Sequence, residues 1–591
     1  MKKILLLKKL FIVSLILFTT ALPQIPEGYK KGLEFINKTD LQKFISVLAD
    51  DSLKGRGAGT DENLEAARFI ARRFYDIGLK PVETKNVRPV KITTDDDDEN
   101  TPLMKSMKTI EPDYYDKYFQ KFFILDTKLA QNNSLKLISN LPTGSKTKEF
   151  DYRNDFIIDY KIPQSLSLSA QVVFVGYGIA EGPNNYSDYV TKNGEKIDVK
   201  DKIVLMLEGY PQQDDTTSVF NRNKKSSIIY SIKKKTTVAL EKGALAVLVA
   251  KSPLKATPPF VVSAEPLFKA FSNNSYTLPE LKTKESIPLI YINNNILNEL
   301  LSVTANELEE QLHDLESSSK SISQELKNKS VQIDIHFKNS LIPSENVVGF
   351  LEGSDAVLKN EFVVVGAHFD HVGLGNYGAM HKKDKGSIHN GADDNASGTA
   401  GMLELAEAFS KCKPKRSIVF IAFNAEEMGM LGSRYYAYQN PMKNIEKTVA
   451  MVNLDMISRN EPKLMWAGGI FYSSDMKKII EEANKEMGFE ILYNVGLLTF
   501  ASDQGPFIRK KVPSVFFFAG LHDDYHTPLD KADKVDYDKV ESISKLAFIS
   551  AWLLANTNDL PKYRELTMDE KIELVKESSE RQKKYRSEDK K

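Results

Sequence analysis

The second half of the chain alternates short apolar strands with amphipathic helix patterns, and no other feature constrains the fold as strongly. Strand-like runs lie at 346–353, 362–370, 417–424, 448–457 and 514–520, and helix-like runs lie at 402–410, 433–438, 475–487 and 538–555. This alternation is typical of an α/β fold with a mixed, mostly parallel sheet and helices on both faces. In such a sheet, ligands gather at the carboxyl ends of the strands.

The rest of the sequence predicts a second module. The 591 residues exceed what one hydrophobic core usually organises. Residues 39–82 have the pattern of two helices joined by a Gly-rich turn, whereas short β runs at 171–179, 202–207 and 287–292 indicate a β-rich module. The expected divisions are a signal peptide at 1–21, an N-terminal part of the α/β domain at 25–90, an inserted β-rich module at 91–335, the main α/β domain at 336–560 and a polar tail at 561–591.

Charge and the N-terminus narrow the possible partners and location. The 80 Lys and Arg residues balance 80 Asp and Glu residues, so no net charge favours nucleic acid. The N-terminus places lysines before an apolar run from Leu10 to Phe18, followed by small residues, which is a signal-peptide pattern. This run is shorter than the roughly 20 residues of a membrane-spanning helix. We therefore expect an exported protein, periplasmic or extracellular, without stable membrane insertion once the signal is cleaved; an uncleaved anchor is the alternative.

Acidic residues and histidines follow the predicted strands of the α/β region. Groups that can bind a metal lie at three predicted strand ends, at one helix start and in one late loop. They are His368 and Asp370; Glu426 and Glu427; Asp455; Asp393 and Asp394 at the helix start; and His526 in the loop. An acidic pair at a helix start is by itself usually a cap. The whole set contains imidazole and carboxylate but no thiolate, which suits zinc in a catalytic site. The only cysteine, Cys412, excludes internal disulfides.

Several motifs resemble the M28 family of di-zinc peptidases, the aminopeptidase and glutamate carboxypeptidase group. They occur in the family's order and approximate spacing: "GAHFDHVG" (366–373), "NGADDNASGTAGMLELAEAF" (390–409), "FIAFNAEEMGMLGSRYY" (420–436), "VNLDMIS" (452–458), "SDQGPF" (502–507) and "YHTPLDKADKV" (525–535). The segment "LKGRGAGTDENLEAARFIARRF" (53–74) also resembles the family's N-terminal part. The module at 91–335 is similar, more loosely, to an inserted protease-associated (PA) domain.

The resemblance implies two zinc ions and a role for each motif residue. His368, Asp394 and Asp455 would hold one ion, and Asp394, Glu427 and His526 the other, so that Asp394 bridges them. Glu426 would act as general base and Tyr525 would stabilise the oxyanion. Asp370 would accept the second ring N–H of His368, and Asp503 is a candidate partner of the substrate amine. We expect a secreted aminopeptidase acting on peptides, with the inserted module either narrowing access to the site or serving as a remote docking module.

Departures from the family pattern leave alternatives open. Gln504 and Ser458 stand where many relatives have His and Gly, which bears on substrate preference. The further histidines His371, His381, His389 and His522 are expected at the rim or in hydrogen bonds. A carboxypeptidase would need an arginine cluster, and only Arg434 and Arg459 lie near the motifs. Glutaminyl cyclisation is disfavoured because that branch keeps one zinc ion. A catalytically silent, receptor-like binding protein would be expected to lose ligands or the base, and none is lost.

Overall fold

The computed structural model describes a large part of the chain as two compact units. It describes residues 25–573 and 576, apart from 83–112, 161–164, 223–229, 255–257, 273, 280–285, 319, 440, 442, 494–495 and 574–575. Unit 1 comprises residues up to 87, 110–122 and 344–591, and unit 2 comprises 88–109 and 123–343. The expected signal peptide lies outside the described residues. Residues 113–122, which fall in the expected insertion, lie in unit 1, and residues 336–343 lie in unit 2.

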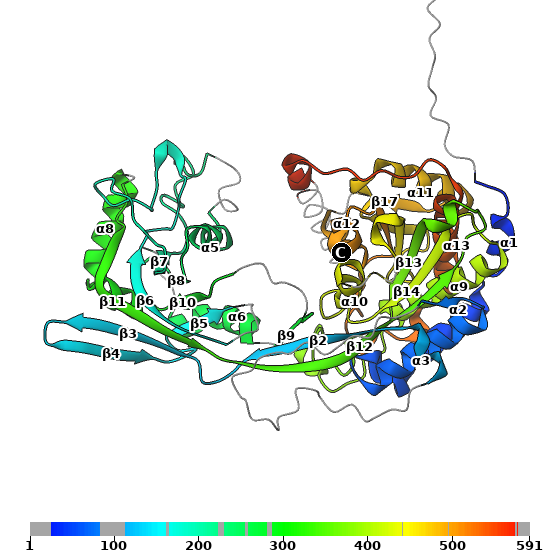
Figure 1. Ribbon diagram of the computed structural model, residues 1–591, viewed down its shortest axis with the longest axis horizontal. Helices are drawn as coiled ribbons and strands as arrows, with labels where there is room; N and C mark the ends of the chain where they lie inside the picture. The colour runs from blue at the N-terminus through cyan, green and yellow to red at the C-terminus, as the bar shows by residue number, and fades with distance from the viewer. Residues whose placement is uncertain are drawn as a thin grey trace, which may run out of the picture. The chain divides into compact units, whose positions relative to one another are not determined.

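Unit 1 is built on a twisted mixed sheet (Figure 1). Its strands are β1 (Lys80–Pro81), β13 (Phe362–His368), β14 (Ser417–Phe423), β15 (Thr448–Leu454), β16 (Leu464–Gly468), β17 (Glu490–Leu492) and β18 (Ser514–Phe518), with β2 (Phe119–Leu129) and β12 (Phe337–Leu351), which each contain a unit boundary. The strand order is β17-β16-β18-β15-β13-β14-β12-β2. The four central strands β14, β13, β15 and β18 run parallel to one another, whereas β12 pairs antiparallel with β14 and β16 pairs antiparallel with β18. The predicted α/β class with a mixed sheet is confirmed.

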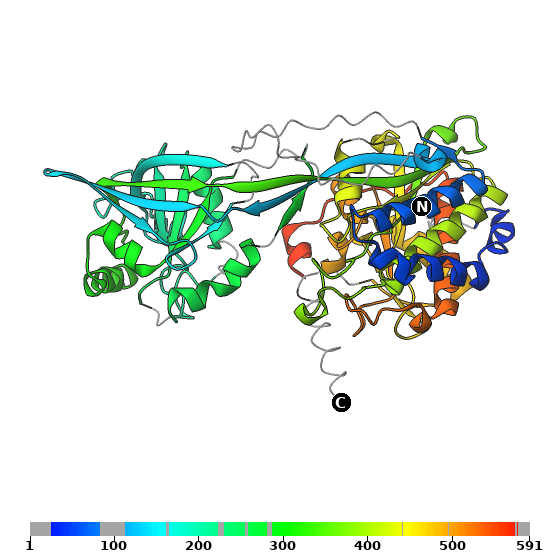
Figure 2. The same ribbon diagram turned by 90° about the horizontal axis from the view of Figure 1, so that it is seen from below.

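Helices cover both faces of this sheet. They are α1 (Tyr29–Leu33), α2 (Lys38–Leu48), α3 (Asp61–Asp76), α9 (Gly398–Lys411), α10 (Leu431–Arg434), α11 (Ser474–Met487), α12 (Gln504–Arg509) and α13 (Tyr537–Asn556). Val363 and Val365 of β13 pack in a core with Phe409 of α9 and Phe548 of α13, while Val364 packs on the opposite face with Phe507 of α12. Figures 1 and 2 show α2, α9 and α13 grouped together on the first face.

Unit 2 has its own sheet and core. Its strands are β3 (Ser134–Leu141), β4 (Gly144–Phe150), β5 (Phe156–Asp159), β6 (Leu166–Phe174), β7 (Ile203–Leu207), β8 (Ala246–Ala250), β9 (Ser275–Thr277), β10 (Leu289–Ile292) and β11 (Gln324–Ile335), and its helices are α5 (Ile232–Glu241), α6 (Phe260–Ser272), α7 (Asn294–Leu301) and α8 (Ala305–Ser318). The eight-stranded sheet has the order β4-β3-β11-β6-β7-β8-β10-β5, with β6, β7, β8 and β10 parallel. Strand β9 pairs instead with β2.

The described helices give no indication of a membrane span: none of them combines the length and the apolar character that crossing a bilayer requires.

Glu345 on β12 is a buried carboxyl group that makes stability depend on pH. Burial raises its pKa to about 8, although Lys121 and Arg68 partly oppose this. Between about pH 4.5 and pH 8 the folded state therefore holds a proton that the unfolded state has released, so the free energy of unfolding falls as pH rises through this window. Each pKa unit is worth about 1.4 kcal/mol, so the loss amounts to a few kcal/mol.

Glu345→Gln is expected to raise thermal stability at pH 8 and to change it little at pH 4.5, because the neutral amide has no proton to lose. Unfolding temperatures measured across this range check the prediction. Glu352→Gln is the matched control, since Glu352 is exposed and paired with Lys80 and Lys359. An unchanged stability difference between pH 4.5 and pH 8 in Glu345→Gln would contradict it.

Candidate metal centre

The parallel strands of unit 1 bring the predicted residues to one edge of the sheet. His368 is the last residue of β13, Glu426 and Glu427 follow β14, and Asp455 follows β15 directly. His526 lies in the loop after β18, and Asp394 lies between β13 and α9. Because these strands are parallel, their carboxyl ends coincide.

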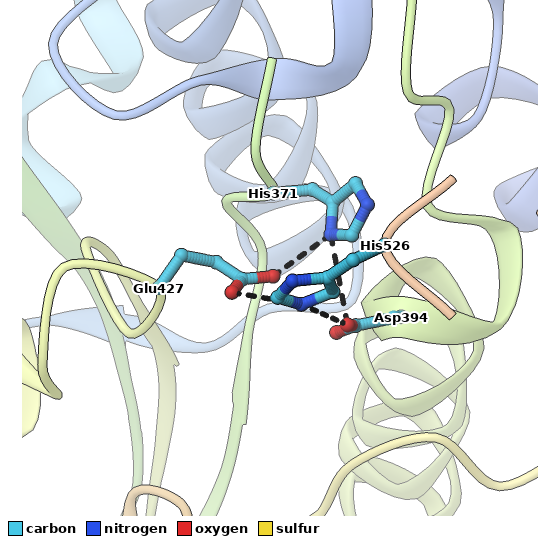
Figure 3. A group of neighbouring side chains, drawn as sticks. All are labelled: His371, Asp394, Glu427 and His526. Atoms are coloured by element: carbon cyan, nitrogen blue, oxygen red, sulfur yellow. Dashed lines mark hydrogen bonds and ion pairs between the residues drawn. The ribbon is translucent and has the colours of Figure 1, made fainter. Parts of the chain in front are cut away.

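Two groups of donor atoms meet at Asp394. Its Oδ1 lies 3.4 Å from Nε2 of His368, which lies 3.2 Å from Oδ1 of Asp455. Its Oδ2 lies 3.1 Å from Nε2 of His526, which lies 3.1 Å from Oε2 of Glu427. His371 also belongs to this second group, shown in Figure 3. Within each group the donor atoms lie within 4.8 Å of one another. Asp394 thus turns one oxygen to each group.

The backbone at Asp394 differs from the predicted helix start. Residues Ala392–Ser397 form an irregular turn, in which Asp394 has φ −102° and ψ 95°, and the regular helix α9 begins only at Gly398. The Asp394–Asn395 peptide is cis. The backbone N–H groups of Asp393 and Asp394 donate to the Asp530 carboxylate at 3.0–3.1 Å. Asp530, four residues after His526, therefore fixes the backbone direction at Asp394.

Backbone carbonyls fix the orientation of two imidazoles. Nδ1 of His368 lies 3.1 Å from the carbonyl oxygen of Asp370, and Nδ1 of His526 lies 2.7 Å from that of Gly378. Because a carbonyl only accepts, Nδ1 carries the proton in both rings and Nε2 faces the carboxylates. The carboxylate of Asp370 was expected to accept a hydrogen bond from His368, but it lies 3.7 Å from Nδ1 of His368. It accepts instead from the backbone N–H groups of Glu426 and Glu427, at 3.1 and 3.3 Å.

The charges show that this site favours a cation. Burial lowers the pKa of His526, but Glu427 and Asp394 more than offset it and raise it to about 11. Burial likewise lowers the pKa of His368, which Asp455 and Asp370 raise well above its usual range. Without a proton or a metal ion, each Nε2 lone pair would face carboxylate oxygens. A zinc ion accepts neutral imidazole and carboxylate ligands and supplies this positive charge in place of the protons, so the donor set fits zinc.

Glu426 and Tyr525 lie beside the donor groups. Burial raises the pKa of Glu426 well above its usual range, and the neighbouring Asp503 and Glu427 raise it further, against His368. Glu426 belongs to neither group, and it is half-buried. The ring of Tyr525 stacks on that of His526 with centroids 3.9 Å apart, and burial raises the pKa of its hydroxyl, which therefore stays protonated.

The remaining candidate residues lie as follows. Asp503 is fully buried, and burial raises its pKa to about 7. The four extra histidines differ in position. His381 is exposed, whereas His389 is buried, with its Nδ1 3.0 Å from the carbonyl oxygen of Ser387. Nε2 of His522 lies 3.3 Å from Oδ2 of Asp393, and His371 is fully buried in the second donor group. His371 is thus not at the rim.

Arg56 supports the site but was not identified in the sequence. Its guanidinium is fully buried and donates to the carbonyls of Phe369 at 2.7 Å, Asn390 at 2.7 Å and Gly391 at 3.0 Å, and also to Leu48. Phe369 directly follows His368, and Asn390 and Gly391 shortly precede Asp394, so Arg56 joins the segments that carry these two residues. Burial lowers the pKa of Arg56 to about 10, so it remains charged at neutral pH. Only its place between two glycines in the predicted turn marks it in the sequence.

Comparisons with known proteins agree with this geometry. Residues 346–550 match peptidase family M28. Aminopeptidase YwaD of Bacillus subtilis is 26% identical over 229 residues, which are 37% of this chain and 46% of that protein. Leucine aminopeptidase 2 of Trichophyton rubrum is 28% identical over 184 residues, which are 30% of this chain and 33% of that protein. The chain thus matches less than half the length of these curated relatives.

Solved structures are also similar to this chain. An aminopeptidase from Aneurinibacillus sp. strain AM-1 is 18% identical with a TM-score of 0.46, covering 91% of this chain and 99% of that one. The zinc aminopeptidase BSAP from Bacillus subtilis is 19% identical with a TM-score of 0.40, covering 91% of this chain and 97% of that one. The six motifs between residues 366 and 535 therefore lie within the segment, residues 346–550, that matches peptidase family M28.

Proposed function

We propose that the protein is an exported di-zinc exopeptidase that removes N-terminal residues from peptides. The observation that carries the proposal is Asp394, whose two oxygens face two separate groups of imidazole and carboxylate donors at 3.4 and 3.1 Å. This is the arrangement that a carboxylate bridging two metal ions requires. Export rests on the signal-peptide pattern of the N-terminus.

The residues around the metal groups divide the chemistry of amide hydrolysis between them. Zinc ions held here would lower the pKa of a water molecule and polarise the substrate carbonyl. Glu426, with a raised pKa and a backbone fixed by Asp370, would take the proton from that water and deliver it to the leaving amine. Tyr525, whose hydroxyl stays protonated, would donate a hydrogen bond to the carbonyl oxygen as negative charge develops there.

Cleavage from the N-terminus is supported by the charges near the site. The carboxylates of Glu426 and Asp455 can pair with a substrate ammonium, while Asp503 is fully buried and raises the pKa of Glu426. Arg459 is committed to Asp524 at 2.9 Å, and burial lowers the pKa of Arg434, with Arg509 nearby. Arg459 thus pairs with an acidic side chain, which leaves it less suited to receive a C-terminal carboxylate. A silent binding protein is disfavoured because all five ligand residues and Glu426 are present.

Metal analysis tests the cofactor assignment. We expect close to two zinc equivalents per chain. A chelator should abolish activity and added zinc should restore it, because the bound zinc would activate the water and polarise the substrate carbonyl. Saturation at a single equivalent would contradict the di-zinc site.

Peptide ladders test the direction of cleavage. A peptide free at both ends should shorten from its N-terminus in mass spectra. N-acetylation removes the ammonium and leaves its carboxylate partners unpaired, a cost of about 1–3 kcal/mol, so the rate should fall roughly tenfold or more. C-amidation should have little effect. Shortening from the C-terminus, blocked by amidation, would instead favour the carboxypeptidase alternative.

A further inference from the structure

His371 is a buried imidazole beside the second donor group that the five-residue set leaves unused. Its Nδ1 lies 2.8 Å from Oε1 of Glu427 and 3.7 Å from Oδ2 of Asp394. Figure 3 shows this nitrogen directed between the two carboxylates, on the side that His526 also faces. The rings of His371 and His526 stand edge to face, with centroids 5.3 Å apart and planes at 81°. Both imidazoles thus converge on the same pair of carboxylates.

The four side chains of this group are close enough together to surround a single ion. Zinc bonds of 2.0–2.2 Å at tetrahedral angles place neighbouring donor atoms roughly 3.3–3.6 Å apart. Nδ1 of His371 lies 3.7 Å and Nε2 of His526 lies 3.1 Å from the same oxygen of Asp394, Oδ2. Toward Glu427, His371 approaches Oε1 at 2.8 Å and His526 approaches Oε2 at 3.1 Å, so both oxygens of that carboxylate face the group. A hydrogen bond from His371 to Glu427 alone would account for the shortest separation but not for the approach to Asp394.

The backbone holds the His371 ring in this direction. Its N–H donates to the carbonyl of Arg56 at 3.3 Å, and its carbonyl accepts from the hydroxyl of Tyr377 at 3.1 Å. The ring packs against Gly391, which has φ +60°, and a Cβ there would lie 2.6 Å from the Cγ and Cδ2 atoms of the ring. These contacts direct Nδ1 of His371 toward the donor group.

Backbone carbonyls accept from Nδ1 of His368 and His526 and so fix which ring nitrogen carries the proton, but Nδ1 of His371 faces the carboxylate of Glu427 instead. Its Nε2 is buried without a hydrogen-bond partner among the described residues. The ring can therefore carry its proton on Nε2 and turn the Nδ1 lone pair toward a cation.

We propose that His371 is a fourth protein ligand of the ion held by Asp394, Glu427 and His526, binding through Nδ1. This inference rests on one part of the proposed function, namely that these residues bind zinc. The ion with four protein ligands resembles a closed site, whereas the ion held by His368, Asp394 and Asp455 keeps an open position. The two ions therefore differ in affinity, and the four-ligand ion is the last to leave in a chelator.

Two substitutions distinguish a ligand from a hydrogen-bond donor. The δ atoms of Asn and Asp stand where Nδ1 of His stands: Asn keeps an N–H donor for Glu427, and Asp keeps an anionic ligand without a donor. If His371 binds the metal, His371→Asn should weaken one of the two zinc affinities by roughly 100-fold or more, beyond what loss of a supporting hydrogen bond usually costs, and His371→Asp should retain it. The opposite order, with Asn tolerated and Asp not, would overturn the proposal.

The measurement is zinc bound per chain across a series of buffered zinc concentrations, with circular dichroism to verify folding. His389→Asn is the matched control, since His389 is a buried neighbour whose Nδ1 donates to Ser387 and an Asn amide can keep that contact. Zinc absorption-edge spectroscopy of the unsubstituted holoprotein gives a second, variant-free answer: three imidazoles per two zinc ions support the proposal, and two contradict it. A protein that binds two zinc ions but cleaves no peptide would contradict the proposed function and leave this inference intact.

Discussion

Glu426→Gln is expected to lower kcat by roughly 10²–10⁴-fold, the usual contribution of general base catalysis, while both metal ions stay bound. Glu426 is outside both donor groups, so its carboxylate is free to carry a proton rather than a metal. Burial raises its pKa well above the usual range, which suits a group that takes up and returns a proton near neutral pH. The amide of Gln has the same size and keeps the backbone bond to Asp370, but it cannot accept a proton from water.

Single-turnover rates and metal content of the same preparation check this prediction. KM should rise far less than kcat falls, because the substitution removes the proton acceptor while Asp455 still faces the substrate ammonium. Glu427→Gln is the matched control, since Glu427 contacts His371 at 2.8 Å and His526 at 3.1 Å and should lose metal as well as activity. Loss of zinc in Glu426→Gln with retention in Glu427→Gln would mean that the two glutamates exchange roles.

The fold of unit 1 could be predicted where strands are buried on both faces. Strands β13, β14 and β15 are mostly apolar runs buried along nearly their whole length, and the groups that can bind a metal stand at or just beyond their carboxyl ends. Strand β17, with three residues, is too short to show a period, and the five-residue strand β16 beside it was not predicted. In unit 2, strand β4 was missed because six of its seven residues are exposed. Its pairing with β3 rests on backbone hydrogen bonds, which a sequence pattern does not display.

The candidate site was predictable where a residue follows a strand and unpredictable where it depends on backbone geometry. His368 and Asp455 stand at strand ends, which the sequence marks. The position of Asp394 depends instead on an irregular turn and on the distant Asp530, 136 residues further along the chain. Arg56 acts through contacts with backbone carbonyls, which leave no signature in side-chain patterns. His371 lies one residue beyond Asp370, and its ring is turned inward by packing against Gly391 and by backbone contacts with Arg56 and Tyr377.

Asp394→Asn should be the most damaging change of a ligand, because it acts on both donor groups at once. An amide has one oxygen and one NH₂ group, so one of the two groups would face N–H donors in place of an anionic oxygen. The substitution also removes a negative charge from a site in which carboxylates must balance the ions. We expect the loss of both zinc ions at concentrations that saturate the unsubstituted protein, and with them all measurable peptidase activity.

Asp455→Asn is the matched control, since Asp455 contacts His368 at 3.2 Å and lies in one donor group only. It should release one zinc ion and retain the other. The fold should persist in Asp394→Asn, because its backbone N–H still donates to Asp530 at 3.0 Å, and circular dichroism of the metal-free proteins checks this. Zinc titrations of the two variants then give the decisive comparison: equal stoichiometry in both would show that Asp394 does not bridge the two groups, whereas loss of two ions against one is the result that a shared carboxylate requires.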